Sequence, residues 1–163
     1  MNADSIKHVD LLLSEFGSAR GIAGATLSEA GTCALNHEDG LEMVLELSQD
    51  GQTLHWYTAI SRVPAEDRES YYARLLSLNL LGQETDGATL ALNNLENEIV
   101  LCYREPVERL DSGRFNNVTE NFLNSSFRLK DQLSQTFQSH QDYQEPLTFR
   151  PQPLEIPMFG MRI

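Results

Sequence analysis

The spacing of apolar residues along the chain predicts three helices. Apolar side chains recur at three- and four-residue steps over residues 5–16, 64–81 and 112–137, which is the pattern of a buried helix face. Gly17 and Gly82 directly follow the first two segments, as glycines commonly follow the end of a helix. The predicted helices therefore lie at the beginning, in the middle and towards the end of the chain.

Alternation of apolar and polar residues predicts strands between these helices. The clearest pair covers residues 41–47 and 54–60, and Asp50-Gly51 between them is typical of a two-residue type I′ hairpin turn. Shorter strands are expected at 25–27, 33–36, 88–92 and 99–104. Strands grouped in hairpins indicate an α+β fold, in which an antiparallel sheet packs with helices in the order α-β-β-β-α-β-β-α.

The predicted hairpin determines which side chains share each face of the sheet. A loop at Asp50-Gly51 places Leu45 opposite Trp56 on an apolar face. The other face then carries Val44 opposite Tyr57, with Glu46 next to them. This second face is half apolar, and it is a place where another segment or protein could dock.

The middle helix is apolar around most of its circumference. A surface helix needs only one apolar stripe, whereas residues such as Tyr72, Leu76 and Leu80 widen the apolar arc here. Two interpretations remain open. The helix is either central to the core or buries its second side in a subunit interface.

The charge of the chain excludes some classes of partner. The 24 acidic residues outnumber the 12 basic ones, which gives a net charge of −12. Phosphate backbones and anionic lipid surfaces repel such a protein, so neither nucleic-acid binding nor membrane insertion is expected. An acidic N-terminus and the lack of any apolar run near 18 residues predict neither a signal peptide nor a membrane span, and therefore a cytoplasmic protein.

The sequence carries no recognisable catalytic or metal-binding pattern. Cys33 and Cys102 lie far apart without CxxC spacing, and the four histidines are scattered. The glycines at 17–24 follow a predicted helix, whereas a nucleotide-binding loop would lead from a strand into one. We therefore expect no enzyme activity, no metal and no cofactor.

The C-terminal residues differ in character from the rest. Four of the six prolines lie beyond residue 145, among large apolar side chains. Proline at this density favours extended backbone over helix. We expect a folded domain over residues 1–140 and a Pro-rich tail over residues 141–163, which is either disordered or docked in an extended form.

Several stretches together resemble one known family. These are LLSLNLLG at 75–82, GATLAL at 87–92, IVLCY at 99–103 and the helix that follows Leu110-Asp111. In combination with the small size, the acidic balance and the predicted order of elements, they are similar to the class I chaperones of type III secretion, the Tir-chaperone-like family. The similarity covers about residues 5–137. The Pro-rich tail is longer than a minimal member of the family needs.

The resemblance implies a homodimeric, ATP-independent chaperone in the bacterial cytoplasm. Such a protein binds the N-terminal chaperone-binding segment of a secreted effector, keeps it soluble and extended, and delivers it to components of the secretion apparatus. By this resemblance, the expected dimer-interface residues are Tyr72, Leu76, Leu80, Leu90 and Leu92. The expected effector-binding residues are Leu12, Leu27, Leu35, Val44 and Tyr57.

Other functions stay open at this stage. Some members of the family sequester a small anti-activator and so couple secretion to transcription. The alternatives outside secretion are a protein-binding adaptor and an α+β domain that binds a small molecule or acts as an enzyme. A polar pocket in the structure would favour the last of these.

Overall fold

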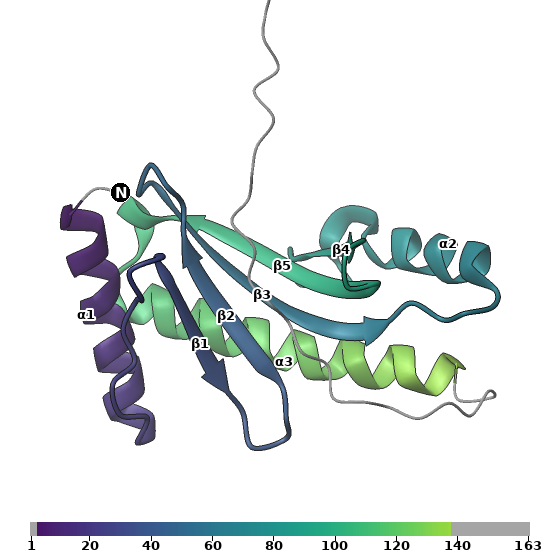
Figure 1. Ribbon diagram of the computed structural model, residues 1–163, viewed down its shortest axis with the longest axis horizontal. Coiled ribbons are helices and arrows are strands. Elements are labelled where there is room, and N and C mark those ends of the chain that lie inside the picture. The colour runs from purple at the N-terminus through teal and green to yellow at the C-terminus, as the bar shows by residue number, and fades with distance from the viewer. Residues whose placement is uncertain (1–2, 138–163) are drawn as a thin grey trace, which may run out of the picture.

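The computed structural model describes residues 3–137 and confirms the predicted α+β order (Figure 1). The elements are α1 (Ala3–Arg20), β1 (Thr32–Asn36), β2 (Glu42–Leu47), β3 (Thr53–Arg62), α2 (Arg68–Leu78), the 3₁₀ turn η1 (Leu80–Gly82), β4 (Thr89–Asn93), β5 (Glu98–Pro106), the 3₁₀ turn η2 (Val107–Arg109) and α3 (Ser112–Phe137). The tail predicted at 141–163 lies outside the described residues.

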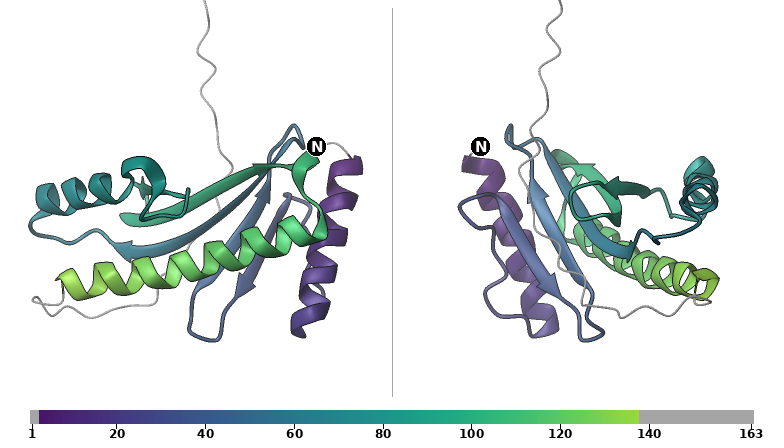
Figure 2. Two further views of the ribbon diagram at one scale, coloured as in Figure 1. Left: turned by 180° about the vertical axis from the view of Figure 1, so that it is seen from behind. Right: turned by 45° about the vertical axis from the view of Figure 1, so that its right-hand side comes forward.

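The strands form one antiparallel sheet in the order β1-β2-β3-β5-β4. α1 and α3 cover one face of this sheet, and α2 lies beside β4 at its far end (Figure 2). The predicted register of the hairpin is confirmed, because Leu45 pairs with Trp56 and Val44 with Tyr57. The two edges of the sheet are therefore β1 and β4.

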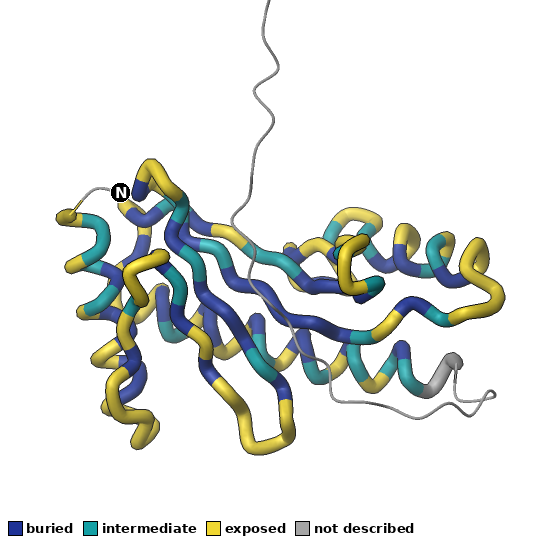
Figure 3. The backbone as a smooth tube through the Cα atoms, in the orientation of Figure 1, coloured by how far each residue is buried: buried dark blue, intermediate teal, exposed yellow. Residues whose placement is uncertain are grey.

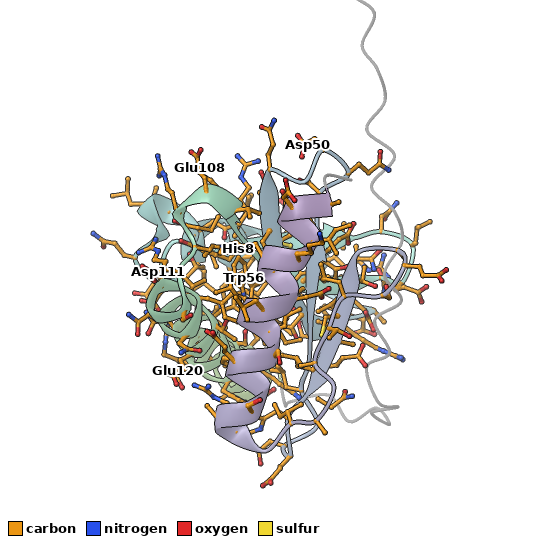
Figure 4. The ribbon with its side chains drawn as sticks, turned by 90° about the vertical axis from the view of Figure 1, so that its left-hand side faces the viewer. His8, Asp50, Trp56, Glu108, Asp111 and Glu120 are labelled. Atoms are coloured by element: carbon orange, nitrogen blue, oxygen red, sulfur yellow. The ribbon has the colours of Figure 1, made fainter. Side chains whose placement is uncertain are left out.

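Aromatic residues fill the core between the sheet and the two helices. Trp56 is fully buried, and its ring centroid lies 5.9 Å from that of Phe115 on α3. Phe16 on α1 packs edge-on against Phe115 at 5.8 Å. Figure 4 shows Trp56 in the interior behind α1, and the tube in Figure 3 is buried along the centre of the sheet. The predicted apolar face of the sheet is thus the core face.

Two polar contacts fix the helices against this core. The indole N–H of Trp56 donates to Oγ1 of Thr119 at 3.1 Å, and both side chains are buried. Nε2 of His8 on α1 lies 2.8 Å from the carbonyl oxygen of Leu110, just before α3. α1 and α3 are therefore tied to parts of the chain distant in sequence.

The sequence predicted that the first helix ends at Gly17, and this prediction is wrong. α1 continues to Arg20, and Gly21 follows it with a φ of 71°. Gly17 instead allows a close approach: the N–H of Ile22 donates to its carbonyl at 2.8 Å, and a Cβ on Gly17 would lie 2.7 Å from the carbonyl oxygen of Ile22. The left-handed glycine, which satisfies the last helical carbonyls, is the real stop.

The expected strand at 25–27, the expected type of the hairpin turn and both expected ends of the middle helix are also wrong. Residues 25–27 form no strand, and the hairpin loop is not type I′, because Gly51 has a positive φ but Asp50 does not. α2 begins at Arg68, after the left-handed Asp67, and ends at Leu78. Left-handed backbone at Leu81 prevents the helix from continuing to Gly82.

The Trp56–Thr119 bond gives a test of the core. We expect Thr119→Val to lower the free energy of unfolding by about 1–3 kcal/mol, because the buried indole N–H loses its acceptor. Thr119→Ser keeps the hydroxyl and is the control. Urea unfolding followed by the fluorescence of Trp56, the single tryptophan, measures both variants. Equal losses in the two variants would contradict a role for the hydrogen bond.

Candidate protein-binding site

The outer edge of β1 is open over its second half. The N–H of His37 donates to the carbonyl of Leu41 on the β2 side at 2.8 Å. Bonds in an antiparallel pair involve alternate residues, so the N–H and C=O groups of Ala34 and Asn36 point away from β2. Both residues are exposed, and no backbone group within residues 3–137 bonds to them on this side. They offer donors and acceptors to an incoming strand.

The first half of the same edge is already occupied. The N–H of Ser28 donates to the carbonyl of Thr32 at 2.7 Å, and the N–H of Thr32 donates to Oγ of Ser28 at 3.2 Å. Oδ1 of Asp10 accepts the N–H of Leu27 at 2.7 Å, which ties this loop to α1. The free part of the β1 edge therefore begins after Thr32 and lies beside α1 and its loop.

The opposite edge of the sheet, β4, is closed at its beginning by other parts of the chain. Asn79 donates from Nδ2 to the carbonyl of Leu90 at 2.9 Å, and its Oδ1 accepts the N–H of Leu90 at 2.8 Å. The hydroxyl of Thr85 donates to the carbonyl of Ala88 at 2.6 Å, and the N–H of Ala88 donates back to the carbonyl of Thr85. A strand added to this sheet therefore finds the beginning of the β4 edge, up to Leu90, taken.

The face of the sheet opposite α1 and α3 carries its own apolar cluster. This second-face cluster consists of Val44, Tyr57, Val100 and Cys102, from β2, β3 and β5. The hydroxyl of Tyr57 donates to Oε2 of Glu46 at 2.6 Å. The sequence predicted this half-apolar face, and the structure separates it from the main core.

Burial favours the uncharged forms of three titratable groups on this face, Tyr57, Cys102 and His55. Burial and the bond to Glu46 raise the pKa of Tyr57 well above its usual range, and burial raises the pKa of the Cys102 thiol to about 11. Burial also lowers the pKa of His55, although the Glu46 carboxylate opposes the shift. At neutral pH Cys102 is therefore a thiol and His55 is mainly a neutral imidazole.

Exposed leucines gather at the β4 end of the sheet, around α2. One side of α2 is buried through Tyr71, Leu75 and Leu78. We call the exposed set the leucine surface; it comprises Leu76, Leu80, Leu81, Leu92 and Leu95. Leu76 is 71% exposed and Leu81 84%, which is unusual for side chains of this size. α2 is therefore not central to the core of the single chain.

The five predicted effector-binding residues lie in two clusters. Leu12 and Leu35 are buried in the main core, and Leu27 is partly buried against it. Val44 and Tyr57 belong to the second-face cluster. The structure therefore divides the five residues between two clusters, and neither Leu12 nor Leu35 is exposed to a partner in this chain.

The five predicted interface residues differ in exposure. Leu76, Leu80 and Leu92 belong to the leucine surface, Tyr72 is partly buried, and Leu90 is only 6% exposed. Sequence reasoning omitted four exposed apolar residues, Leu11, Ile22, Leu81 and Leu95. Leu11 could have been found, since it falls off the stripe formed by Val9, Leu13 and Phe16.

A metal site, a membrane span and a polar pocket are three features that residues 3–137 could carry. No three His, Cys, Asp or Glu side chains lie close enough to hold a metal, and none of the helices there is long and apolar enough to cross a membrane. A pocket of about 110 Å³ lies between α3 and the loop before β4. Its charged groups are already paired, Asp86 with Arg128 at 2.8 Å and Arg114 with Glu105 at 3.0 Å.

An open sheet edge, a second apolar face and a leucine surface define a small α+β protein-binding domain. Residues 11–130 match the Tir chaperone protein (CesT) family. The chain belongs to this family, which confirms the resemblance to class I type III secretion chaperones. No curated protein matches the chain.

Solved structures share the fold at low sequence identity. The ExsC–ExsE complex matches with a TM-score of 0.69 at 19% identity, over 82% of this chain and 97% of that one. The HopA1–SchA chaperone–effector complex gives 0.64 at 14%, over 80% and 98%. The Yersinia pestis type III secretion chaperone SycH, in complex with a fragment of YscM2, gives 0.57 at 15%, over 74% and 98%.

The closed β4 edge can be tested at Asn79. We expect Asn79→Ala to lower the free energy of unfolding by about 1–3 kcal/mol, because both backbone groups of Leu90 lose their partner. Asn93→Ala, which removes a single exposed bond to the N–H of Leu95, is the matched control and should change stability by less than about 1 kcal/mol. Urea titration compares them, and equal losses would show that Asn79 does not hold the edge.

Proposed function

We propose that the protein is an ATP-independent chaperone of type III secretion. It binds the N-terminal segment of an effector, keeps that segment soluble and extended, and delivers it to the secretion apparatus. The open edge at Ala34 and Asn36 is the observation that carries this proposal. Family membership and the complexes named among the structural neighbours support it.

Strand addition is the mode of binding that the edge supports. A client strand paired with the second half of β1 gains main-chain hydrogen bonds whatever its sequence. Its side chains contact the surfaces on either side of the edge, and these contacts give specificity. Leu11 on α1 is 56% exposed, and Ile22 in the following loop is 37% exposed. Both belong to the region beside this edge, and both are candidates for contacts with the client.

The leucine surface supports a homodimer. Burying a leucine side chain contributes about 1.5–3 kcal/mol, so five exposed leucines are costly for a chain that stays monomeric. The surface lies at the β4 end of the sheet, away from the open β1 edge (Figure 1). A dimer formed through this surface leaves the open β1 edge of each chain accessible to a client.

The negative charge fits this role in the bacterial cytoplasm. A chaperone that holds apolar segments must itself resist self-association, and a net charge of −12 per chain opposes it. The same charge favours clients that are less acidic than the chaperone. It also disfavours nucleic acid as a partner.

Substitution of Ala34 tests the client edge. Its N–H points away from β2, so Ala34→Pro removes a donor for the client and leaves the β1–β2 ladder intact. We expect the dissociation constant for a co-purified effector segment to rise about 3–10-fold, which corresponds to one lost hydrogen bond. Calorimetric titration measures the constant.

Ala34→Thr retains the N–H and serves as the control at the same position. It should bind the segment as the wild type does, and circular dichroism should show both variants folded. If the proline variant binds as tightly as the threonine variant, the client does not pair with this part of β1.

Substitution of Leu76 tests the dimer. We expect Leu76→Asp to raise the dimer dissociation constant by about 100-fold or more, because a carboxylate in an apolar interface is poorly solvated. Light scattering coupled to size exclusion should give twice 18.4 kDa for the wild type and 18.4 kDa for the variant. Leu11→Asp, on the distant α1, should remain dimeric; a wild type that is monomeric at micromolar concentration would refute the interface.

A further inference from the structure

The β1 residues whose backbone groups point outward also direct their side chains to the second face of the sheet. Leu35, which lies between Ala34 and Asn36, belongs to the main core. Its two neighbours therefore lie on the other face, because side chains alternate along a strand. Ala34 lies opposite Val44 of β2. Asn36 lies opposite Glu42, and a client strand bonded to this edge places alternate side chains beside both pairs.

An apolar row of side chains crosses the second face from Ala34. Val44, Tyr57 and Cys102 follow it in register on β2, β3 and β5, and all three belong to the second-face cluster. Ala34 is exposed and ends in a single methyl group, so it leaves room beside the edge. A client side chain next to Ala34 continues this row, which favours an apolar residue at that position.

The next position on the same face is acidic. Glu42 is partly exposed, and within residues 3–137 no hydrogen bond or ion pair engages its carboxylate; the hydroxyl of Thr58 bonds to its backbone carbonyl. Glu46, on the same strand and face, accepts the hydroxyl of Tyr57 and lies opposite Thr32, where the edge is occupied. Glu42 is therefore the carboxylate that the open half of the edge presents to a client.

A basic side chain of the client can reach this carboxylate. Adjacent strands lie about 4.8 Å apart, so a client strand lies about 10 Å from β2. The long side chains of lysine and arginine, together with that of Glu42, span this distance across the short side chain of Asn36. The chain itself supplies no competitor nearby in sequence, since it has six acidic residues and no lysine or arginine between Arg20 and Arg62.

We propose that Glu42 selects clients that carry a lysine or arginine two residues from an apolar residue in the strand that joins β1. The apolar side chain lies beside Ala34, and the basic one pairs with the Glu42 carboxylate across Asn36. The spacing is two residues because side chains on one face of a strand recur at every second position. This inference rests on the proposed function, since it requires a client strand at the β1 edge.

The same pairing acts against other clients. A client with an acidic residue at the second position brings two carboxylates close together, and no basic residue of β1 or β2 offsets the repulsion. Selection by Glu42 is thus local, whereas the net charge of the chain acts on the client as a whole.

Charge reversal at Glu42 tests this selection. The probe is the N-terminal effector segment that co-purifies with the chain, and calorimetric titration at about 0.15 M salt gives its dissociation constant. We expect Glu42→Gln to raise the constant about 3–5-fold and Glu42→Lys to raise it about tenfold or more. Glu38→Gln and Glu38→Lys make the same charge changes in the hairpin loop between β1 and β2. These matched controls should change the constant by less than about twofold, because salt screens a charge that makes no direct contact.

A matching change in the client shows whether the effect comes from a pair of charges. Each lysine or arginine of the effector segment is replaced by glutamate in turn. We expect one replacement, two residues from an apolar residue, to weaken binding to the wild-type chain and to regain at least about tenfold in affinity with Glu42→Lys. Restored binding of this kind does not arise from a misfolded chain.

The outcomes separate this inference from the proposed function. If Ala34→Pro weakens binding but Glu42→Lys has no larger effect than Glu38→Lys, strand addition stands and selection by Glu42 is refuted. Selection is also refuted if Glu42→Lys restores the binding of no client variant. If Ala34→Pro has no effect, or no effector segment co-purifies, the client does not pair with this edge and both proposals fail.

Discussion

The position of β3 between β2 and β5 is the constraint on which the rest of the structure depends. β3 pairs with β5 from Thr53 to Arg62, with one irregularity near Ala59, and with β2 along its first half. Because successive side chains point to opposite faces, this pairing places Trp56 under α3 and Tyr57 on the other face. The core and the second-face cluster are therefore two consequences of one register.

The parts of the fold governed by local pattern could be predicted from the sequence. Alternation across the Asp50-Gly51 loop predicted the correct partners of Leu45 and Val44. The ends of α1 and α2 could not be predicted, because contacts with the loops that follow each helix decide them. Gly17 is required by Ile22, and Asn79 is held by Leu90 across a loop.

The candidate site was harder to predict for a related reason. Periodicity separates apolar from polar positions, but it does not say which apolar side of an element meets the chain's own core. Leu12 and Leu90 are buried, whereas Leu11 and Leu81 are exposed, and all four are leucines in apolar segments. The openness of the β1 edge is a property of backbone groups. No residue type in the sequence marks this open edge. Only the position of β1 at the end of the sheet indicates it.

The placement of the open edge and the leucine surface at opposite ends of the sheet sets a length scale for the client. A five-stranded sheet is about 20 Å wide. In a dimer joined through the leucine surfaces, the two β1 edges lie about 40 Å apart or more, so an extended client needs at least about 12 residues to reach from one to the other. Two short segments with a spacer of that length would bind both edges of one dimer, with the second binding event effectively intramolecular. The dimer would thereby favour clients that carry two correctly spaced segments over clients that carry a single segment.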